Sequence, residues 1–223
     1  MNVAVLSLTR DRLAYTKHCF GTLLKNAGCT FDWWITDQGS TDGTVEWLIA
    51  NTDATVTAYE TNAGICPALN AMLDDVIASA DYDVIVKVDN DCELLTPNTL
   101  RDVCEYALDR DAIVSPWIRG LRTTPESYAC DFGISLTPVI GSIFMAVPAW
   151  VFACGYRHPI LPTLDGDDSA LCGWFQQERG GYVGYIDGYE ANHYETTDGQ
   201  HARYPEYFAR REQERLDARM VSA

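Results

Sequence analysis

Short apolar runs alternate with helical patterns over the first 116 residues, and this alternation restricts the chain to one class of fold. The runs that predict strands lie at residues 3–8, 31–36, 54–59, 84–92 and 113–116. Between them, apolar residues recur at helical spacing. Strand–helix alternation requires mostly parallel strands joined by right-handed crossovers. The sequence therefore predicts an α/β fold, a Rossmann-like domain with a mostly parallel central sheet flanked by helices.

The second half of the chain has a less regular pattern. Residues 117–138 show no clear period, whereas later stretches predict strands at 141–147 and 182–186 and helices at 148–152, 167–179 and 205–220. In the first half, Thr96 followed by Pro97 predicts a helix start, because Pro is favoured at the first helical position. A chain of 223 residues without linker-like stretches is expected to form a single domain, 1–223.

The charge balance limits the partners of the chain. The formal net charge is -16, the sequence pI is about 4.4, and the only lysines are Lys17, Lys25 and Lys87. Such a surface repels polyanions. Non-specific binding to nucleic acid or to anionic membranes is therefore not expected.

The sequence shows no membrane-spanning segment, no signal peptide and no Cys-x-x-Cys pair, and this bears on where the protein is located. No apolar stretch reaches membrane-spanning length, and the apolar run at residues 3–8 is too short for a signal peptide. The 8 cysteines include no Cys-x-x-Cys pair, which disfavours a structural zinc site. We therefore expect a cytoplasmic protein without a transmembrane segment.

The strand predicted at residues 84–92 ends in two carboxylates, Asp89 and Asp91. Because side chains alternate along an extended strand, both carboxylates are expected on one side of it. They would repel each other unless a cation lay between them, and Mg²⁺ or Mn²⁺ prefers oxygen ligands. Ligands of open α/β sheets collect at the carboxyl ends of the strands. The alternative is that both residues only cap a turn or the following helix.

Further motifs follow one another in a fixed order along the chain. Residues 37–44 read Asp-Gln-Gly-Ser-Thr-Asp-Gly-Thr, and residues 68–70, Ala-Leu-Asn, follow an Asn-x-Gly turn. The other motifs are Asp89-Asn90-Asp91, Gly141-Ser142, Gly155, Gly166-Asp167-Asp168 and His193. Together, from Val3 to about His193, these motifs resemble a family 2 glycosyltransferase of the A fold. Leu69 departs from the pattern, since that family commonly has Arg there.

The resemblance implies a different role for each of three parts of the chain. Residues 1–116 would form the nucleotide-sugar-binding half, 117–200 the acceptor and catalytic half, and 201–223 a C-terminal helix. The donor would be a nucleoside diphosphate sugar, with UDP as the favoured nucleotide. The residues implied to bind it are Thr9, Arg10, Asp37, Asn62, Gly64, Asn70, Asp89 and Asn90.

The resemblance also implies the chemistry. Mn²⁺ or Mg²⁺ held by Asp91 and His193, with Asp89 as a further ligand, would neutralise the leaving diphosphate. Asp168 would act as general base on the acceptor hydroxyl, with Asp167 as the alternative, and a single base implies inversion. The acceptor, whose identity the sequence leaves open, would lie near Trp117, Gly141 and Ser142.

A polar segment near the end of the chain is expected to cover the donor. Residues 195–200 resemble a flexible lid, and Arg203 or His201 is expected to close on the diphosphate.

Two other functions compete with glycosyl transfer. A nucleotidyltransferase usually has a Gly-rich loop after its first strand, whereas residues 7–12 contain no Gly, which argues against this function. A non-catalytic nucleotide or carbohydrate binder would not need both Asp91 and Asp168.

Overall fold

The structure of the chain is a computed structural model that describes residues 1–120, 128–130, 133–160, 167–194 and 197–221. The strands are β1 (Val3–Thr9), β2 (Asp32–Gln38), β3 (Thr55–Tyr59), β4 (Val84–Val88), β5 (Cys92–Leu94), β6 (Ala112–Arg119), β7 (Tyr128–Cys130), β8 (Ile134–Leu136), β9 (Phe144–Pro148) and β10 (Tyr182–His193). The helices are α1 (Leu13–Asn26), α2 (Thr44–Asn51), α3 (Ile65–Ser79), α4 (Thr99–Arg110), α5 (Trp150–Ala153), α6 (Asp167–Arg179), α7 (Thr197–Arg203) and α8 (Pro205–Val221).

One mixed sheet forms the centre of the molecule. Its strand order is β3-β2-β1-β4-β9-β6-β10-β8-β7, and β5 pairs with β10 off this path. The pairs β3–β2, β2–β1, β1–β4 and β6–β10 are parallel, whereas β9 runs antiparallel between β4 and β6. The α/β fold with a mostly parallel sheet, predicted from the sequence, is confirmed.

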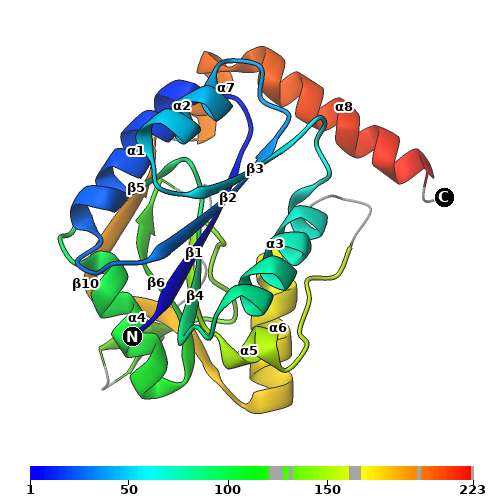
Figure 1. Cartoon of the computed structure of the whole chain (residues 1–223). Helices are drawn as coiled ribbons and strands as arrows, with labels where there is room; N and C mark the ends of the chain where they lie inside the picture. The colour runs from blue at the N-terminus through cyan, green and yellow to red at the C-terminus, as the bar shows by residue number, and fades with distance from the viewer. Residues whose placement is uncertain (121–127, 131–132, 161–166, 195–196, 222–223) are drawn as a thin grey trace.

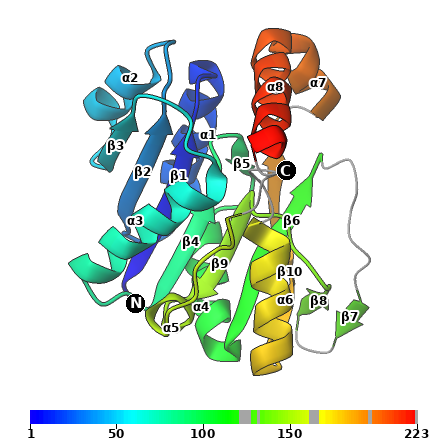
Figure 2. The same cartoon turned by 90° about the vertical axis from the view of Figure 1, so that its right-hand side faces the viewer.

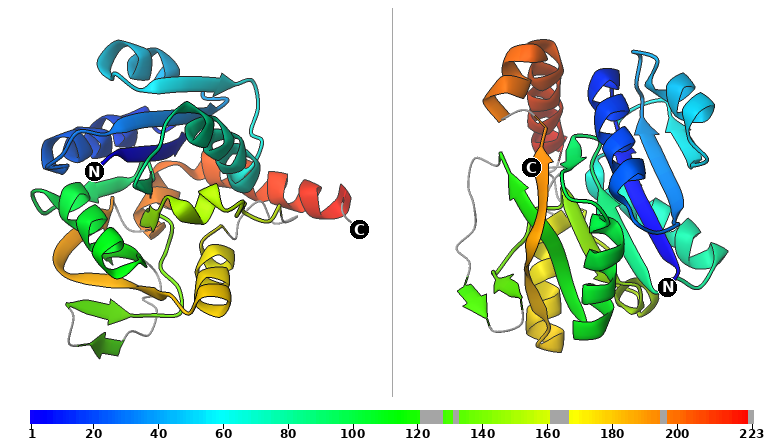
Figure 3. Two further views of the ribbon diagram at one scale, coloured as in Figure 1. Left: turned by 60° about the horizontal axis from the view of Figure 1, so that its bottom comes forward. Right: turned by 90° about the vertical axis from the view of Figure 1, so that its left-hand side faces the viewer.

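Helices cover both faces of this sheet, as Figures 1 and 3 show. Helices α1 and α4 pack on one face, and α3, α5 and α6 pack on the other. The central strand β4 is buried along its whole length, which explains its run of apolar β-branched residues. The core therefore lies on both sides of β1, β4 and β9, and the loops at the carboxyl ends of the parallel strands are left to form a site.

The strand predicted at residues 84–92 is shorter than the sequence indicates. β4 ends at Val88, and the backbone N–H of Cys92 donates to the carbonyl of Asp89 at 3.1 Å, which closes a turn over Asp89–Asp91. Asp89 and Asp91 therefore do not belong to the strand, and the prediction that strand alternation puts them on one side is wrong. A turn, rather than a strand, decides where each carboxylate points.

Two other local predictions also differ from the structure. α4 begins at Thr99 after Asn98 in the left-handed region (φ 63°), whereas Thr96 lies before it and accepts a hydrogen bond from the Thr99 hydroxyl. Of the segment predicted as a lid, Thr197 and the residues after it belong to helix α7, while residues 195 and 196 lie outside the described residues.

β10 is longer than the predicted strand at 182–186, and its extension reaches the site. It pairs with β6 in two stretches separated by a register shift between Ile186 and Glu190. Beyond the shift it also pairs antiparallel with β5, so His193 lies opposite Cys92. The backbone pairing therefore brings His193 next to the turn that carries Asp91.

Helices α7 and α8 lie above the carboxyl ends of the parallel strands (Figure 2). The exposed face of α8 includes Leu216 and several charged residues. Within the described part of the chain, the helices lack the combination of length and apolar character that a bilayer crossing needs.

Candidate active site

A pocket of about 760 Å³ opens at the carboxyl ends of β1 and β4. The strand ends and the following turns supply its floor, including Thr9, Arg10 and the turn 89–91. His193 from the end of β10 lines one part of it, and residues of α7 and α8 cover it from above. This position agrees with the rule that open α/β sheets bind ligands beyond the carboxyl ends of their strands.

Arg12 is the centre of the polar network in this pocket. Its Nη1 donates to Asp91 Oδ2 and to Gln200 Oε1, each at 3.0 Å, and its Nη2 donates to Asn90 Oδ1, also at 3.0 Å. His193 Nε2 lies 3.3 Å from Asp91 Oδ2. Asp91 is 7% exposed, so its charge is balanced by the guanidinium rather than by water.

A strained turn aims Arg12 at the pocket. Asp11 and Arg12 both have positive φ (50° and 60°), which is uncommon for residues other than Gly. The loop after β2 holds this turn, because Ser40 Oγ accepts from the Asp11 backbone N–H at 2.6 Å and Asp11 accepts from the Thr41 N–H at 2.9 Å. The 37–44 motif therefore supports the residues that follow β1.

The charges of Asp91, Arg12 and His193 depend on one another. Burial alone would raise the pKa of Asp91, but the charge of Arg12 and the hydrogen bond with His193 outweigh burial and hold that pKa well below its usual range. Burial would lower the pKa of His193, yet its contact with Asp91 raises it overall. Asp91 is thus a fixed anion at the pocket floor.

Asp89 has a different environment from Asp91. Its Oδ1 lies 2.9 Å from Lys87 Nζ, and its side chain is 28% exposed. Lys87 also donates to the carbonyl and to the hydroxyl of Ser142, each at 2.9 Å. Ser142, predicted on the acceptor side, therefore lies beside a lysine that lines the pocket.

Asp37 is placed below the pocket surface. It is fully buried, and it accepts hydrogen bonds from the Thr9 hydroxyl (2.7 Å), the Ser40 N–H (2.8 Å) and the Ser40 hydroxyl (2.5 Å). The neighbouring residue Gln38 lines the pocket, whereas Asp37 is not among the described lining residues. In this structure Asp37 holds the turns that carry the pocket residues.

The turn before α3 brings Asn62 into the pocket. Asn62 Oδ1 accepts from the Gly64 N–H at 3.0 Å, and Gly64 has a φ of 91°, a conformation that favours glycine. The backbone N–H of Ala63 donates to Gln38 Oε1 at 2.9 Å. Asn62 therefore lies at the N-terminal end of α3 with its side chain facing the same pocket as Arg10.

Asn70, also predicted to bind the donor, instead ties α3 to the segment after α5. Its Nδ2 donates to the carbonyl of His158 and its Oδ1 accepts from the N–H of His158, each at 2.8 Å. Replacing Asn70 with alanine removes two hydrogen bonds and is expected to lower the free energy of unfolding by about 2 kcal/mol. Urea denaturation measures this loss.

The matched control for Asn70 is Asn51→Ala, because Asn51 is exposed and its side chain makes a single local hydrogen bond, to the Trp47 carbonyl. Asn51→Ala is expected to change stability by less than about 0.5 kcal/mol. Nucleotide affinity is expected to stay within about twofold in Asn70→Ala. A large loss of nucleotide affinity with unchanged stability would contradict a supporting role for Asn70.

The predicted catalytic acids lie at the start of α6. Asp168 Oδ1 accepts from the Ser169 N–H at 2.6 Å and from the Ser169 hydroxyl at 3.2 Å, so it caps the first turn of the helix. Asp167 is the first residue of α6, but its side chain, like residue Gly166, lies outside the described residues. Among the residues that the structure describes, Asp168 is not part of the pocket lining.

The remaining predicted residues divide between the pocket and its surroundings. His201 lines the pocket and stacks on Phe208 of α8, with ring centroids 3.8 Å apart. Arg203 places its guanidinium over the ring of Tyr15, 5.4 Å from its centroid. Trp117 packs edge-on against Tyr185, with centroids 5.1 Å apart.

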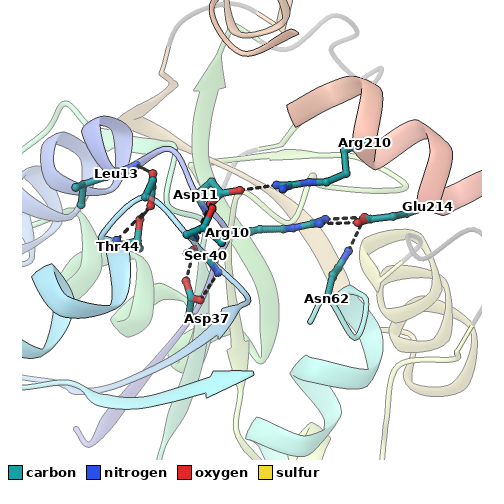
Figure 4. A network of polar contacts seen from close by, with 11 residues as sticks. Arg10, Asp11, Leu13, Asp37, Ser40, Thr44, Asn62, Arg210 and Glu214 are labelled. Carbon is teal, nitrogen blue, oxygen red and sulfur yellow. Dashed lines mark hydrogen bonds and ion pairs between the residues drawn. The ribbon is translucent and has the colours of Figure 1, made fainter. Parts of the chain in front are cut away.

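The C-terminal helix contributes residues that the sequence did not point to. Figure 4 shows Glu214 of α8 between Arg10 and Asn62, and Arg210 of the same helix beside Asp11.

Two further pocket residues, Arg12 and Lys87, were not predicted to bind the ligand, although the sequence contains a signal for each of them. Arg12 follows a strand end, and Lys87 is a charged residue inside an apolar strand, which requires a partner.

These features define the chain as an α/β protein whose ligand pocket lies at the strand ends and combines carboxylates with fixed cations. The family model described as Glycosyl transferase family 2 matches residues 5–129, which is more than half of the chain. The chain belongs to this family of glycosyltransferases. A comparison with curated proteins finds no match.

Several solved structures share the fold. They include S. aureus TarS 1–349 in complex with UDP-GlcNAc (17% identity, TM-score 0.66, covering 86% of this chain and 58% of that one). The mannosyltransferase PcManGT from Pyrobaculum calidifontis, in complex with GDP-Man and Mn²⁺, has 18% identity and a TM-score of 0.66, covering 90% and 59%. GalNAc-T7 with UDP, GalNAc and Mn²⁺ has 13% identity and a TM-score of 0.66, covering 88% and 44%. The chain spans less than two thirds of each of these chains.

Proposed function

We propose that the protein transfers a sugar from a nucleoside diphosphate sugar to an acceptor hydroxyl, with UDP as the favoured nucleotide and with inversion at the anomeric carbon. The observation that carries the proposal is the joint presence of Asp91, His193, Arg12 and Lys87 at one pocket. Nucleotide-bound structures of the same fold support it. In this proposal, residues 1–116 bind the donor and 117–200 supply the acceptor side, while residues of helices α7 and α8 cover the pocket.

The site fits a divalent cation that is bound by the protein and by the phosphates of the donor together. Asp91 and His193 offer one carboxylate and one imidazole, with Oδ2 and Nε2 3.3 Å apart, and the carboxylate suits both Mn²⁺ and Mg²⁺. In the described part of the chain, no group of three or more His, Cys, Asp or Glu residues is arranged to hold a metal. Mg²⁺ commonly takes one or two carboxylates and completes its shell with substrate phosphates.

The two ring nitrogens of His193 have different surroundings. Its Nδ1 is buried and has no hydrogen-bond partner, whereas its Nε2 faces Asp91 and Gln200. In the proposal Nε2 and the Asp91 carboxylate would hold Mn²⁺ or Mg²⁺, and Asp89 would stay with Lys87. The bound metal would act as a Lewis acid on the leaving diphosphate.

The chain's own cations act on the same leaving group. As the bond from the anomeric carbon to the diphosphate oxygen breaks, negative charge grows on that oxygen. Arg12 and Lys87 are fixed in place by Asp91, Asn90 and Ser142, so they can stabilise this charge without rearranging. The diphosphate leaves with the bonding electron pair.

Asp168 is proposed to remove the proton of the acceptor hydroxyl while its oxygen attacks the anomeric carbon. A positioned carboxylate commonly contributes this step, and the proton ends on the carboxylate. The position of Asp168 at the first turn of α6 supports the role, because the helix holds it in place. Attack opposite the leaving group inverts the configuration of the sugar.

A donor panel tests the proposed function. The full chain is incubated with UDP- and GDP-sugars, with Mn²⁺, with Mg²⁺ and with EDTA, and release of free UDP or GDP is measured with and without simple sugar acceptors. The expected result is release from at least one donor that Mn²⁺ or Mg²⁺ stimulates and EDTA suppresses. Measurable nucleotide binding without release from any donor would overturn the proposal in favour of a non-catalytic binder.

A further inference from the structure

The contact between Arg10 and Glu214 joins the floor of the pocket to the helix above it. Arg10 Nη1 donates to Glu214 Oε2 at 2.6 Å, and Nη2 donates to Oε1 at 2.5 Å. Asn62 Nδ2 donates to Oε2 as well, at 3.1 Å. The carboxylate is therefore held by three N–H donors that come from the end of β1 and from the turn before α3 (Figure 4).

These donors are the kind that bind phosphate. A guanidinium offers two parallel N–H groups, and this fork matches the oxygens of a carboxylate and of a phosphate equally well. Asn62 adds a third donor at the N-terminal end of the 15-residue helix α3, where negative charge is favoured. In addition, the Nε of Arg10 is buried without a hydrogen-bond partner, so Arg10 has a donor that its contact with Glu214 leaves unused.

The two groups reinforce each other's charge. The hydrogen bond from Arg10 lowers the pKa of Glu214, and the hydrogen bond to Glu214 raises the pKa of Arg10. A second tie from the same helix joins Arg210 to Asp11, the neighbour of Arg10 in sequence. These two charge pairs join helix α8 to the residues that follow β1.

We propose that Arg10 and Asn62 form a phosphate subsite and that Glu214 fills it when no donor is bound. Helix α8 then competes with the donor from within the chain, and a phosphate group of the donor displaces Glu214. The proposal deepens the proposed function, since it assumes that the pocket is the donor site. It assigns Glu214 and α8 to control of donor entry, a role separate from sugar transfer.

Under such competition, the apparent affinity for the ligand equals the affinity of the open subsite multiplied by the fraction of molecules in which the subsite is open. If α8 is docked in about nine molecules out of ten, the apparent affinity falls about tenfold. Replacing Glu214 with glutamine keeps the size of the side chain and removes its charge, so the subsite is released. Glu214→Gln is therefore expected to bind the phosphate probe about tenfold more tightly.

Pyrophosphate is the probe, and isothermal titration calorimetry of the full chain without added metal measures its affinity. The matched control is Glu206→Gln, which changes the net charge equally at an exposed position in the first turn of α8. The control is expected to bind pyrophosphate within about twofold of the unmodified chain. Arg10→Lys keeps the charge but removes the fork, and it is expected to bind at least tenfold more weakly.

Hydrogen exchange of the amides in residues 205–221 gives a second readout. Pyrophosphate is expected to speed this exchange in the unmodified chain, because α8 leaves the pocket. In Glu214→Gln, exchange is expected to be fast already without the probe.

Three results would overturn the proposal. They are equal pyrophosphate affinity in Glu214→Gln and Glu206→Gln, slower exchange of α8 on binding, and no measurable pyrophosphate binding by any variant. None of these measurements depends on sugar transfer. Failure of the donor panel alone therefore rejects the proposed function and leaves this test standing.

Discussion

Replacing Asp91 with asparagine lowers the free energy of unfolding by about 3 kcal/mol, the largest loss of stability expected from one substitution in the pocket. Asp91 is 7% exposed, and its carboxylate balances the buried guanidinium of Arg12. An asparagine has nearly the same shape but no charge. Arg12 would then be a buried cation without its counter-charge, which accounts for the size of the loss.

A double-mutant cycle separates this effect from the general cost of changing a buried residue. Arg12→Met, Asp91→Asn and the double variant are compared by urea denaturation. The double variant is expected to be less destabilised than the sum of the two single variants, because removing both charges leaves neither one unpaired. Strictly additive losses would show that Arg12 and Asp91 do not depend on each other.

Asp168→Asn lowers turnover roughly 10²–10⁴-fold, the range that a positioned general base commonly contributes. The substitution keeps an oxygen that can accept from the Ser169 N–H, so the start of α6 and the stability of the fold are expected to be preserved. Donor affinity is expected to stay within about twofold, since Asp168 is not part of the described pocket lining. The effect should therefore fall on kcat rather than on donor binding.

The comparison that decides the role of Asp168 uses Asp167→Asn beside it, with Asp109→Asn on the exposed face of α4 as the control. Asp167→Asn is expected to lower turnover less than tenfold, and Asp109→Asn to leave it unchanged. Steady-state kinetics at saturating donor measure all three. Near-native turnover in Asp168→Asn, or a larger loss in Asp167→Asn, would transfer the base role to Asp167.

The sequence was sufficient for the class of fold and for the position of the pocket. Apolar periodicity is a local property, so the strands and helices up to about residue 116 could be predicted from neighbouring residues alone. The resemblance to family 2 glycosyltransferases rests on short motifs, and the family match confirms it. Four parts of the chain that the resemblance implies for donor binding, Thr9, Arg10, Asn62 and the turn 89–91, lie at one pocket.

The contacts within the pocket could not be predicted in the same way, because they join residues far apart in the chain. Arg10 and Glu214 are separated by 204 positions, and Arg12 and Asp91 by 79. Short motifs also leave open whether a polar residue faces the ligand or the protein. Asp37 accepts hydrogen bonds from Thr9 and Ser40. In the structure its role is therefore to support the neighbouring turns.

The pairing of β10 with β5 has a consequence for the order in which the pocket can be assembled. Arg12, Lys87 and Asp91 come from strands and turns within the first 91 residues, whereas His193 arrives only when β10 has joined β6 and β5. A folding intermediate without β10 would carry the cations and the carboxylate but no imidazole. The β1–β4 pairing that brings Arg12 to Asp91 also joins distant parts of the chain, so loop-closure entropy delays both pairings, and ligand affinity would appear late in refolding, after most of the secondary structure.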